Sequence, residues 1–205
     1  LPDVGYAFLE KDVHLLNMQN GLADNTVSAV YKDKEGFVWF GTRNGLSRYD
    51  GRQITNFEQS NSYPSISNLK EVFDGVLAFV DNGVFSAFDL KKERFLSVVS
   101  SSGQGIPSRG MLQKNDSLVW VISGSELHLM KRCASKEGEL RLRVQEKYTG
   151  WNNQDNLLVA ITYSSDKKSI CLIDEKGRII LLDATNLNSF RVIDLGRTGS
   201  LSVNS

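Results

Sequence analysis

The sequence predicts an all-β chain that folds as part of a β-propeller, with about four to five four-stranded blades. Two observations lead to this fold class. Short runs rich in β-branched and aromatic residues alternate with tight-turn dipeptides. The pattern also recurs: the second strands of successive units centre near Trp39, Leu77, Trp120 and Cys171, at spacings of 38, 43 and 51 residues. A repeat of that length with four strands per unit is typical of a propeller blade.

The first unit, residues 17–57, has the clearest pattern. Its expected strands are residues 27–31, 37–40, 46–49 and 53–57. The connections contain Gly36, Asn44-Gly45 and Asp50-Gly51. Asn-Gly and Asp-Gly favour tight hairpins because these residues tolerate a positive φ. Four short strands joined by three tight turns predict an antiparallel meander in which sequence neighbours pair.

Three further units are expected at residues 65–99, 108–148 and 156–195. One window of the second unit has a competing pattern, since its apolar residues between 69 and 80 fall at helical spacing. Asp74-Gly75 lies in the middle of that window, and glycine costs about 1 kcal/mol in a helix interior. We therefore predict strand, turn and strand here.

The whole chain, residues 1–205, is expected to be a single segment of a longer propeller. Residues 1–16 would supply an N-terminal closing strand, and residues 198–205 the start of a further blade. The expected partners are the remaining propeller blades of the same protein. The open edge would tend to pair with another chain, which makes a homodimer a second expectation.

Composition narrows the classes of function. Lys+Arg and Asp+Glu each number 24, so the formal net charge is zero, which argues against nucleic-acid binding through this segment. No apolar run approaches the roughly 20 residues that span a bilayer, so no membrane contact is expected in this segment. Cys133 and Cys171 lack metal-ligand spacing; unpaired thiols are expected, with a disulfide left open.

Catalytic motifs are missing from the sequence. It contains no zinc-protease, nucleophile-elbow or phosphate-cradling motif. His14 lies in a strand-like stretch without an acidic neighbour, so a structural role is expected. We predict no catalytic residue, no metal ligand and no cofactor.

Three segments of the first unit resemble the two-component regulator propeller repeat. They are residues 20–27 (NGLADNTV), 33–42 (DKEGFVWFGT) and 44–51 (NGLSRYDG). The resemblance implies the periplasmic sensor region of a hybrid two-component system histidine kinase of Bacteroides-type bacteria. Such propellers sense glycans or their breakdown products and control genes for polysaccharide use. The implied ligand is therefore an oligosaccharide or polysaccharide fragment, and the implied location is the periplasm.

Candidate binding residues follow from propeller geometry. Loops before the innermost strand and after the second strand share one face near the axis. In this chain they supply Asp24, Asn25, Arg43, Asn44, Trp151 and Asn152. An aromatic ring with nearby amides suits a sugar. The competing interpretation is that Asp24 and Asn25 are turn residues and that Trp151 packs between blades.

Two other functions fit the same fold. A propeller glycoside hydrolase or lyase would need two carboxylates held roughly 5–9 Å apart, which sequence alone does not pair. A protein–protein interaction scaffold would use the exposed face to bind another protein. The resemblance favours the sensor over both.

Overall fold

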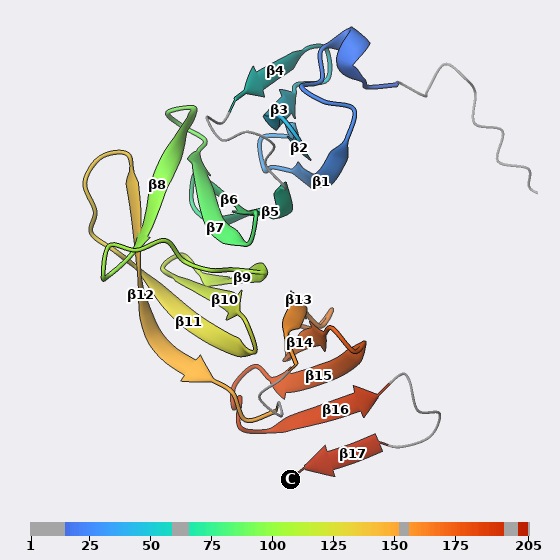
Figure 1. Ribbon diagram of the computed structural model, residues 1–205, viewed down its shortest axis with the longest axis vertical. Coiled ribbons are helices and arrows are strands. Elements are labelled where there is room, and N and C mark those ends of the chain that lie inside the picture. The colour runs from blue at the N-terminus through green and yellow to red at the C-terminus, as the bar shows by residue number, and fades with distance from the viewer. Residues whose placement is uncertain (1–14, 59–65, 152–155, 195–200, 205) are drawn as a thin grey trace, which may run out of the picture.

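The computed structural model describes residues 15–58, 66–151, 156–194 and 201–204 of the chain (Figure 1). Apart from the short 3-10 helix η2 (Met18–Asn20), the described elements are β-strands. The first unit contains β1 (Val27–Lys32), β2 (Val38–Thr42), β3 (Gly45–Tyr49) and β4 (Ile54–Phe57). These strands form an antiparallel meander in chain order, as the turn signals predict.

The other units repeat this meander. The second contains β5 (Ile66–Phe73), β6 (Val76–Asp81), β7 (Val84–Asp89) and β8 (Arg94–Ser100). The third contains β9 (Gly110–Asn115), β10 (Leu118–Ser123), β11 (Glu126–Cys133) and β12 (Glu139–Tyr148). The fourth contains β13 (Leu158–Tyr163), β14 (Ser169–Asp174), β15 (Arg178–Asp183), β16 (Phe190–Asp194) and β17 (Leu201–Asn204). The four second-strand centres predicted from the sequence lie in β2, β6, β10 and β14.

The window with helical spacing is strand, turn and strand. β5 and β6 flank Asp74-Gly75, and Gly75 has φ +71°. This backbone conformation is easy for glycine and costly for most other residues. The local turn signal therefore outweighs the apolar periodicity, and the prediction is confirmed.

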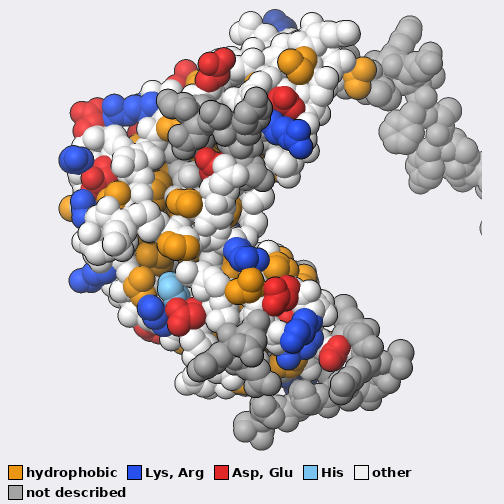
Figure 2. Space-filling view, in the orientation of Figure 1, with side chains coloured by type: hydrophobic (Ala, Val, Ile, Leu, Met, Phe, Trp, Pro, Cys, Tyr) orange, Lys and Arg blue, Asp and Glu red, His pale blue; other side chains and the backbone are white. Residues whose placement is uncertain are grey.

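The units are arranged radially, as in a β-propeller (Figure 1). The inner strands β1, β5, β9 and β13 lie next to one another on the concave side of an open arc. Figure 2 shows the hollow that this arc encloses. The first two units approach closely at Gly41, where an added Cβ would lie 2.5 Å from Cγ2 of Ile66.

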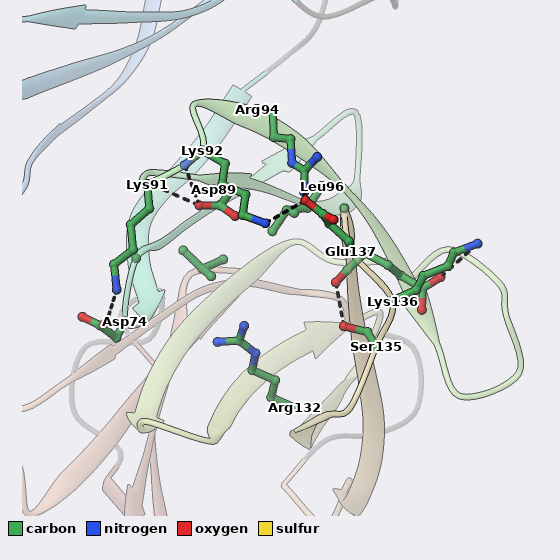
Figure 3. Close-up of a pocket in the computed structure, with 14 residues that line it drawn as sticks. Asp74, Asp89, Lys91, Lys92, Arg94, Leu96, Arg132, Ser135, Lys136 and Glu137 are labelled. Atoms are coloured by element: carbon green, nitrogen blue, oxygen red, sulfur yellow. Dashed lines mark hydrogen bonds and ion pairs between the residues drawn. The ribbon is translucent and has the colours of Figure 1, made fainter.

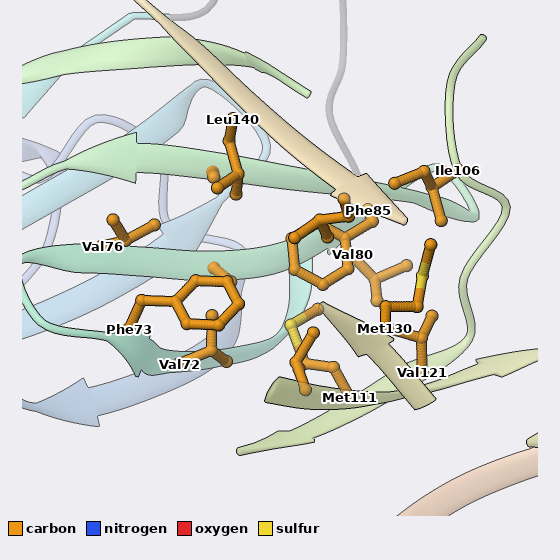
Figure 4. Packing of buried hydrophobic residues seen from close by; sticks show 14 residues of the cluster. Val72, Phe73, Val76, Val80, Phe85, Ile106, Met111, Val121, Met130 and Leu140 are labelled. Carbon is orange, nitrogen blue, oxygen red and sulfur yellow. The ribbon is translucent and has the colours of Figure 1, made fainter. Parts of the chain in front are cut away.

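The hydrophobic core lies between the units. In β6, Leu77 and Phe79 pack toward the first unit, whereas Val76, Ala78 and Val80 pack toward the third. β10 repeats this division between the second and fourth units. A central strand of a blade therefore buries both faces, which explains apolar runs that do not alternate. Figure 4 shows the cluster between the second and third units.

Two strand pairings are not predicted from the sequence. β8 pairs in parallel with the start of β12, from Ser97 opposite Glu139 to Ser100 opposite Leu142. The second and third units therefore share one eight-stranded sheet. β17 pairs antiparallel with β16 and adds a fifth strand to the sheet of the fourth unit, where the sequence predicts the start of a separate blade.

Other expectations concern the termini and the cysteines. Of the predicted closing strand at residues 1–16, residues 1–14 lie outside the described part, and Leu15 is exposed. Cys133 and Cys171 are free thiols and half-buried. Within the described ranges, no helix combines the length and apolar character needed to cross a bilayer.

Candidate ligand-binding face

One end of the propeller strands carries a cavity that involves three units. The β2–β3 and β6–β7 turns and the approaches to the inner strands lie at this end, which we call the loop face. The cavity at the loop face has a volume of about 370 Å³. The loop-face cavity is lined by Ser67, Val80, Asn82, Gly83, Ser108, Arg109 and Val159.

Backbone hydrogen bonds hold the lining in place. The Ser108 amide donates to the carbonyl of Gly83 over 2.8 Å, which ties the β6–β7 turn to the approach to β9. Asn82 and Gly83 both have a positive φ, +48° and +80°. Asn and Gly are the residues that tolerate this conformation best. The turn is therefore set by its sequence and does not depend on a ligand.

The inner strands are tied together on the same side. Asn68 has φ +52°, and its side-chain Nδ2 donates to the carbonyl of Arg109 over 3.2 Å. The Arg109 amide donates to Ile122 over 3.0 Å. Among the described residues, the Arg109 guanidinium has no hydrogen-bond or ion-pair partner, and the residue is exposed. The cavity thus offers one unengaged cation beside amide and hydroxyl groups.

The lining combines polar and apolar groups in a way that suits a polar organic molecule. Asn82 supplies an amide, Ser67 and Ser108 supply hydroxyls, and Val159 is 38% exposed. Small-molecule sites typically combine apolar surface with a few convergent polar groups. No carboxylate lines the described part of this cavity. It therefore lacks, in that part, the carboxylate pair that glycoside hydrolysis uses.

The structure places the predicted residues of the first unit at this same end. Asp24 Oδ1 accepts from the Thr26 amide over 2.6 Å, and Asn25 Oδ1 accepts from the Met18 amide over 2.9 Å. Asn44 Nδ2 donates to the Ala23 carbonyl over 3.1 Å, so the two predicted loops do meet.

Arg43 and Trp151 complete the described part of the predicted set. Arg43 is exposed. Trp151 is 7% exposed and packs between the third and fourth units in a cluster that includes Trp120 and Leu158. Asn152 lies outside the described residues. The five predicted residues that the structure describes do not line the loop-face cavity.

Three residues of the cavity lining are not predicted from the sequence: Asn82, Ser108 and Arg109. A signal for Asn82 existed, because Asn82-Gly83 occupies the position in the second unit that Asn44-Gly45 occupies in the first. No comparable signal existed for Arg109, since its place at the cavity depends on β9 lying between β5 and β13.

The hydrogen-bonded pair of His128 and Glu126 lies outside the loop-face cavity. His128 Nε2 lies 2.6 Å from Glu126 Oε2, and this hydrogen bond lowers the pKa of Glu126. Neither residue lines the cavity. Among the described residues, no group of three or more His, Cys, Asp and Glu side chains could hold a metal ion.

The radial meanders and the interblade cores define a β-propeller segment, and solved structures agree with this fold. The chain matches the extracellular domain of a protein described as a hybrid two-component system of Bacteroides thetaiotaomicron (16% identity, TM-score 0.55, 90% of this chain and 23% of that one). It also matches the extracellular domain of a one-component system of the same organism (14% identity, TM-score 0.53, 89% and 33%). PorZ, a surface component of the type-IX secretion system of Porphyromonas gingivalis, matches at 11% identity and TM-score 0.63, over 93% and 29%.

Part of the first unit matches the model of a known repeat family. Residues 21–44 match the model of the two-component regulator propeller. This match agrees, over residues 21–44, with the resemblance seen in the sequence. The chain spans between about a quarter and a third of the length of the three solved structures named above. No curated protein sequence matches it significantly.

Proposed function

We propose that this chain is part of the ligand-sensing propeller of an extracytoplasmic two-component regulator, and that the loop-face cavity contributes to ligand binding. The two-component regulator propeller repeat at residues 21–44 is the observation that carries the proposal. The likeness to two extracellular domains of bacterial one- and two-component systems supports it. The segment itself would be non-catalytic, and a histidine kinase would form part of the full-length protein.

The ligand that we propose is a glycan, sensed in the periplasm to control genes for polysaccharide use. The cavity lining supports a sugar because it combines hydroxyl, amide and guanidinium donors with the apolar surface of Val159. Sugar hydroxyls need such donors and acceptors, and the C–H face of the ring needs an apolar surface. Arg109 is the residue on which most of the polar affinity should depend.

A glycan-binding assay tests the proposal. The complete extracytoplasmic region that contains this chain is titrated with a library of oligosaccharides, and one class should bind saturably. Arg109→Gln should weaken that binding about tenfold, because a hydrogen bond to a charged group is worth about 1.5–3 kcal/mol. Arg52→Gln is the matched control, since Arg52 is an exposed cation in the β3–β4 turn at the other end of the strands.

Three results would contradict the proposal. Absence of saturable binding to every oligosaccharide would refute the glycan ligand. Specific capture of a protein from periplasmic extract, with no sugar bound, would favour a scaffold. Turnover of a glycan that is lost on a single carboxylate substitution would favour an enzyme.

A further inference from the structure

A second cavity lies at the opposite end of the strands, between the second and third units. Its lining comes from the β5–β6 turn, the β7–β8 turn and the β11–β12 connection, and its volume is about 410 Å³ (Figure 3). Consecutive strands of a meander run in opposite directions, so these turns lie away from the β6–β7 turn of the loop face. This volume is within the usual range for small-molecule sites.

The walls of this cavity are held by backbone pairing. The parallel β8–β12 ladder joins its two sides, and the Ser97 amide donates to the Gly138 carbonyl over 2.9 Å. On the other side, the Leu90 amide donates to Gly75 over 2.9 Å. The backbone of these walls is therefore in place before any ligand arrives, which reduces the main-chain entropy lost on binding.

Positive charge exceeds negative charge in the lining. Five cations, Lys91, Lys92, Arg94, Arg132 and Lys136, face four carboxylates, Asp74, Asp89, Glu137 and Glu139. An anion is therefore the complementary ligand if one of these cations is free to bind it. The hydrogen bonds and ion pairs of each carboxylate decide which cation that is.

Each carboxylate already has partners. Asp74 pairs with Lys91 at 3.0 Å, and Asp89 accepts from the backbone amides of Lys91 and Lys92. Glu137 pairs with Lys92 at 2.8 Å and with Arg94 at 2.9 Å.

The fourth carboxylate is engaged in the same way. Glu139 pairs with Arg141 at 2.9 Å and lies 3.9 Å from Lys136. Neither it nor the other three carboxylates pairs with Arg132.

Among the described cations of this lining, Arg132 is the one without a carboxylate partner. It extends from β11 into the cavity (Figure 3). Its guanidinium lies 5.6 Å from the centre of the Phe73 ring and makes no hydrogen bond or ion pair with a described residue. Packing on a ring leaves the N–H edge of a guanidinium available. A second donor, the Arg94 Nε–H, is buried without an acceptor among the described residues.

We propose that this cavity binds an oxyanion on a small molecule, a carboxylate, sulfate or phosphate group, with Arg132 as the principal contact. The planar guanidinium presents two parallel N–H donors that match two oxygens of such a group. The proposal does not depend on the proposed sensing function, because the cavity lies at the opposite end of the strands from the loop face.

Calorimetric titration tests the site with defined probes. The chain is titrated at low ionic strength with inorganic sulfate, inorganic phosphate and glucuronate, and with glucose as the neutral comparison. At least one anion should bind saturably and glucose should not. Binding of glucuronate alone would identify a sugar acid as the source of the group, and binding of sulfate or phosphate would identify the free ion.

Substitutions assign the binding to Arg132. Arg132→Gln should weaken anion binding about tenfold or more, and Arg132→Lys should restore it only in part, because lysine lacks the planar pair of donors. Lys131→Gln is the matched control: it removes one charge from the neighbouring position of β11, whose side chain points to the other face of the sheet. It should leave the affinity unchanged.

Some outcomes would overturn the proposal. It fails if none of the three anions binds saturably at millimolar concentrations. It also fails if Arg132→Gln, folded by circular dichroism with an unchanged melting temperature, binds as the unsubstituted chain does. Equal weakening by Lys131→Gln would show unspecific attraction to positive charge, which also refutes the site.

Discussion

Asp33 is the residue that holds the β1–β2 turn together. Its Oδ1 accepts from the amides of Glu35 and Phe37 at 3.0 and 2.9 Å, and its Oδ2 accepts from Trp39 Nε1 at 2.8 Å. Asp33 is 7% exposed and Trp39 is 1% exposed. The sequence places Asp33 in a turn but not its bond to Trp39, because that bond depends on how the indole enters the core.

Replacing Asp33 should therefore destabilise the fold. Asp33→Ala leaves the buried indole N–H without an acceptor, and such a loss costs about 1–3 kcal/mol of the free energy of unfolding. Urea unfolding measures the change. Glu35→Ala, an exposed carboxylate in the same turn, should change the free energy by less than about 0.5 kcal/mol. Equal effects of the two substitutions would contradict the role of Asp33.

The ion pairs of the Asp74 carboxyl group should make the stability of the fold depend on pH. Hydrogen bonds from Lys34 and then Lys91 lower its pKa from 3.8 to about 2. Because the pKa is lowered in the folded state, the stabilisation by these ion pairs is present above about pH 4 and is lost as the pH falls through about 2.

An NMR titration of the Asp74 carboxyl carbon checks this shift. The midpoint should lie near pH 2, and Lys34→Gln should move it up toward 3.8. Lys92→Gln should leave it in place, since Lys92 pairs with Glu137 and not with Asp74. A midpoint near 3.8 in the unsubstituted chain would refute the pairing.

At the scale of elements, Gly41 determines how closely β2 approaches β5. An added Cβ would lie 2.5 Å from Ile66 Cγ2 and 3.3 Å from the Cβ of Ala29. The glycine has an ordinary φ, so the constraint is space between two units and not backbone conformation. The repeat motif contains Gly41, but the motif does not show why a glycine is needed there. The reason is the close contact with Ile66 of the second unit.

Gly41→Ala should destabilise the chain by about 1–3 kcal/mol through overpacking. Differential scanning calorimetry or urea unfolding would measure the loss. Gly105→Ala is the control, because its added Cβ would meet Val84 at 3.8 Å, an ordinary contact distance. If Gly41→Ala were neutral while Gly105→Ala was not, the close approach of β2 and β5 would be wrong.

At the scale of the whole molecule, the second and third units form one structural body. They share the apolar cluster of Figure 4 and the parallel β8–β12 pairing. The first unit joins the second mainly through a separate cluster around Trp39 and Phe88. Regions that share a core and a sheet tend to open together, whereas regions joined by fewer contacts open at lower cost.

Native-state hydrogen exchange tests this division. The amides of β6, β7, β10 and β11 should show the same free energy of opening, and those of β2 and β3 a lower one. The amide of Ser97, which donates to Gly138, should be protected with the first group. Independent opening of the second and third units would contradict a single body.

The sequence by itself determined the local elements of this protein. Asn44-Gly45 and Asp74-Gly75 act on the chain within a few residues, so the turns, the strands between them and the four-unit repeat could be predicted. The apolar runs of β6 and β10 are buried on both faces in the structure, because each strand packs between two neighbouring units.

The tertiary structure alone decided what depends on residues far apart in the chain. The β8–β12 pairing, the addition of β17 to the sheet of the fourth unit and the place of Trp151 in the core each join segments that no local signal links. Both cavities arise in the same way, because Arg109 and Arg132 line a site only through the neighbouring units. Local backbone preference therefore sets the elements, whereas contact between blades sets the sites.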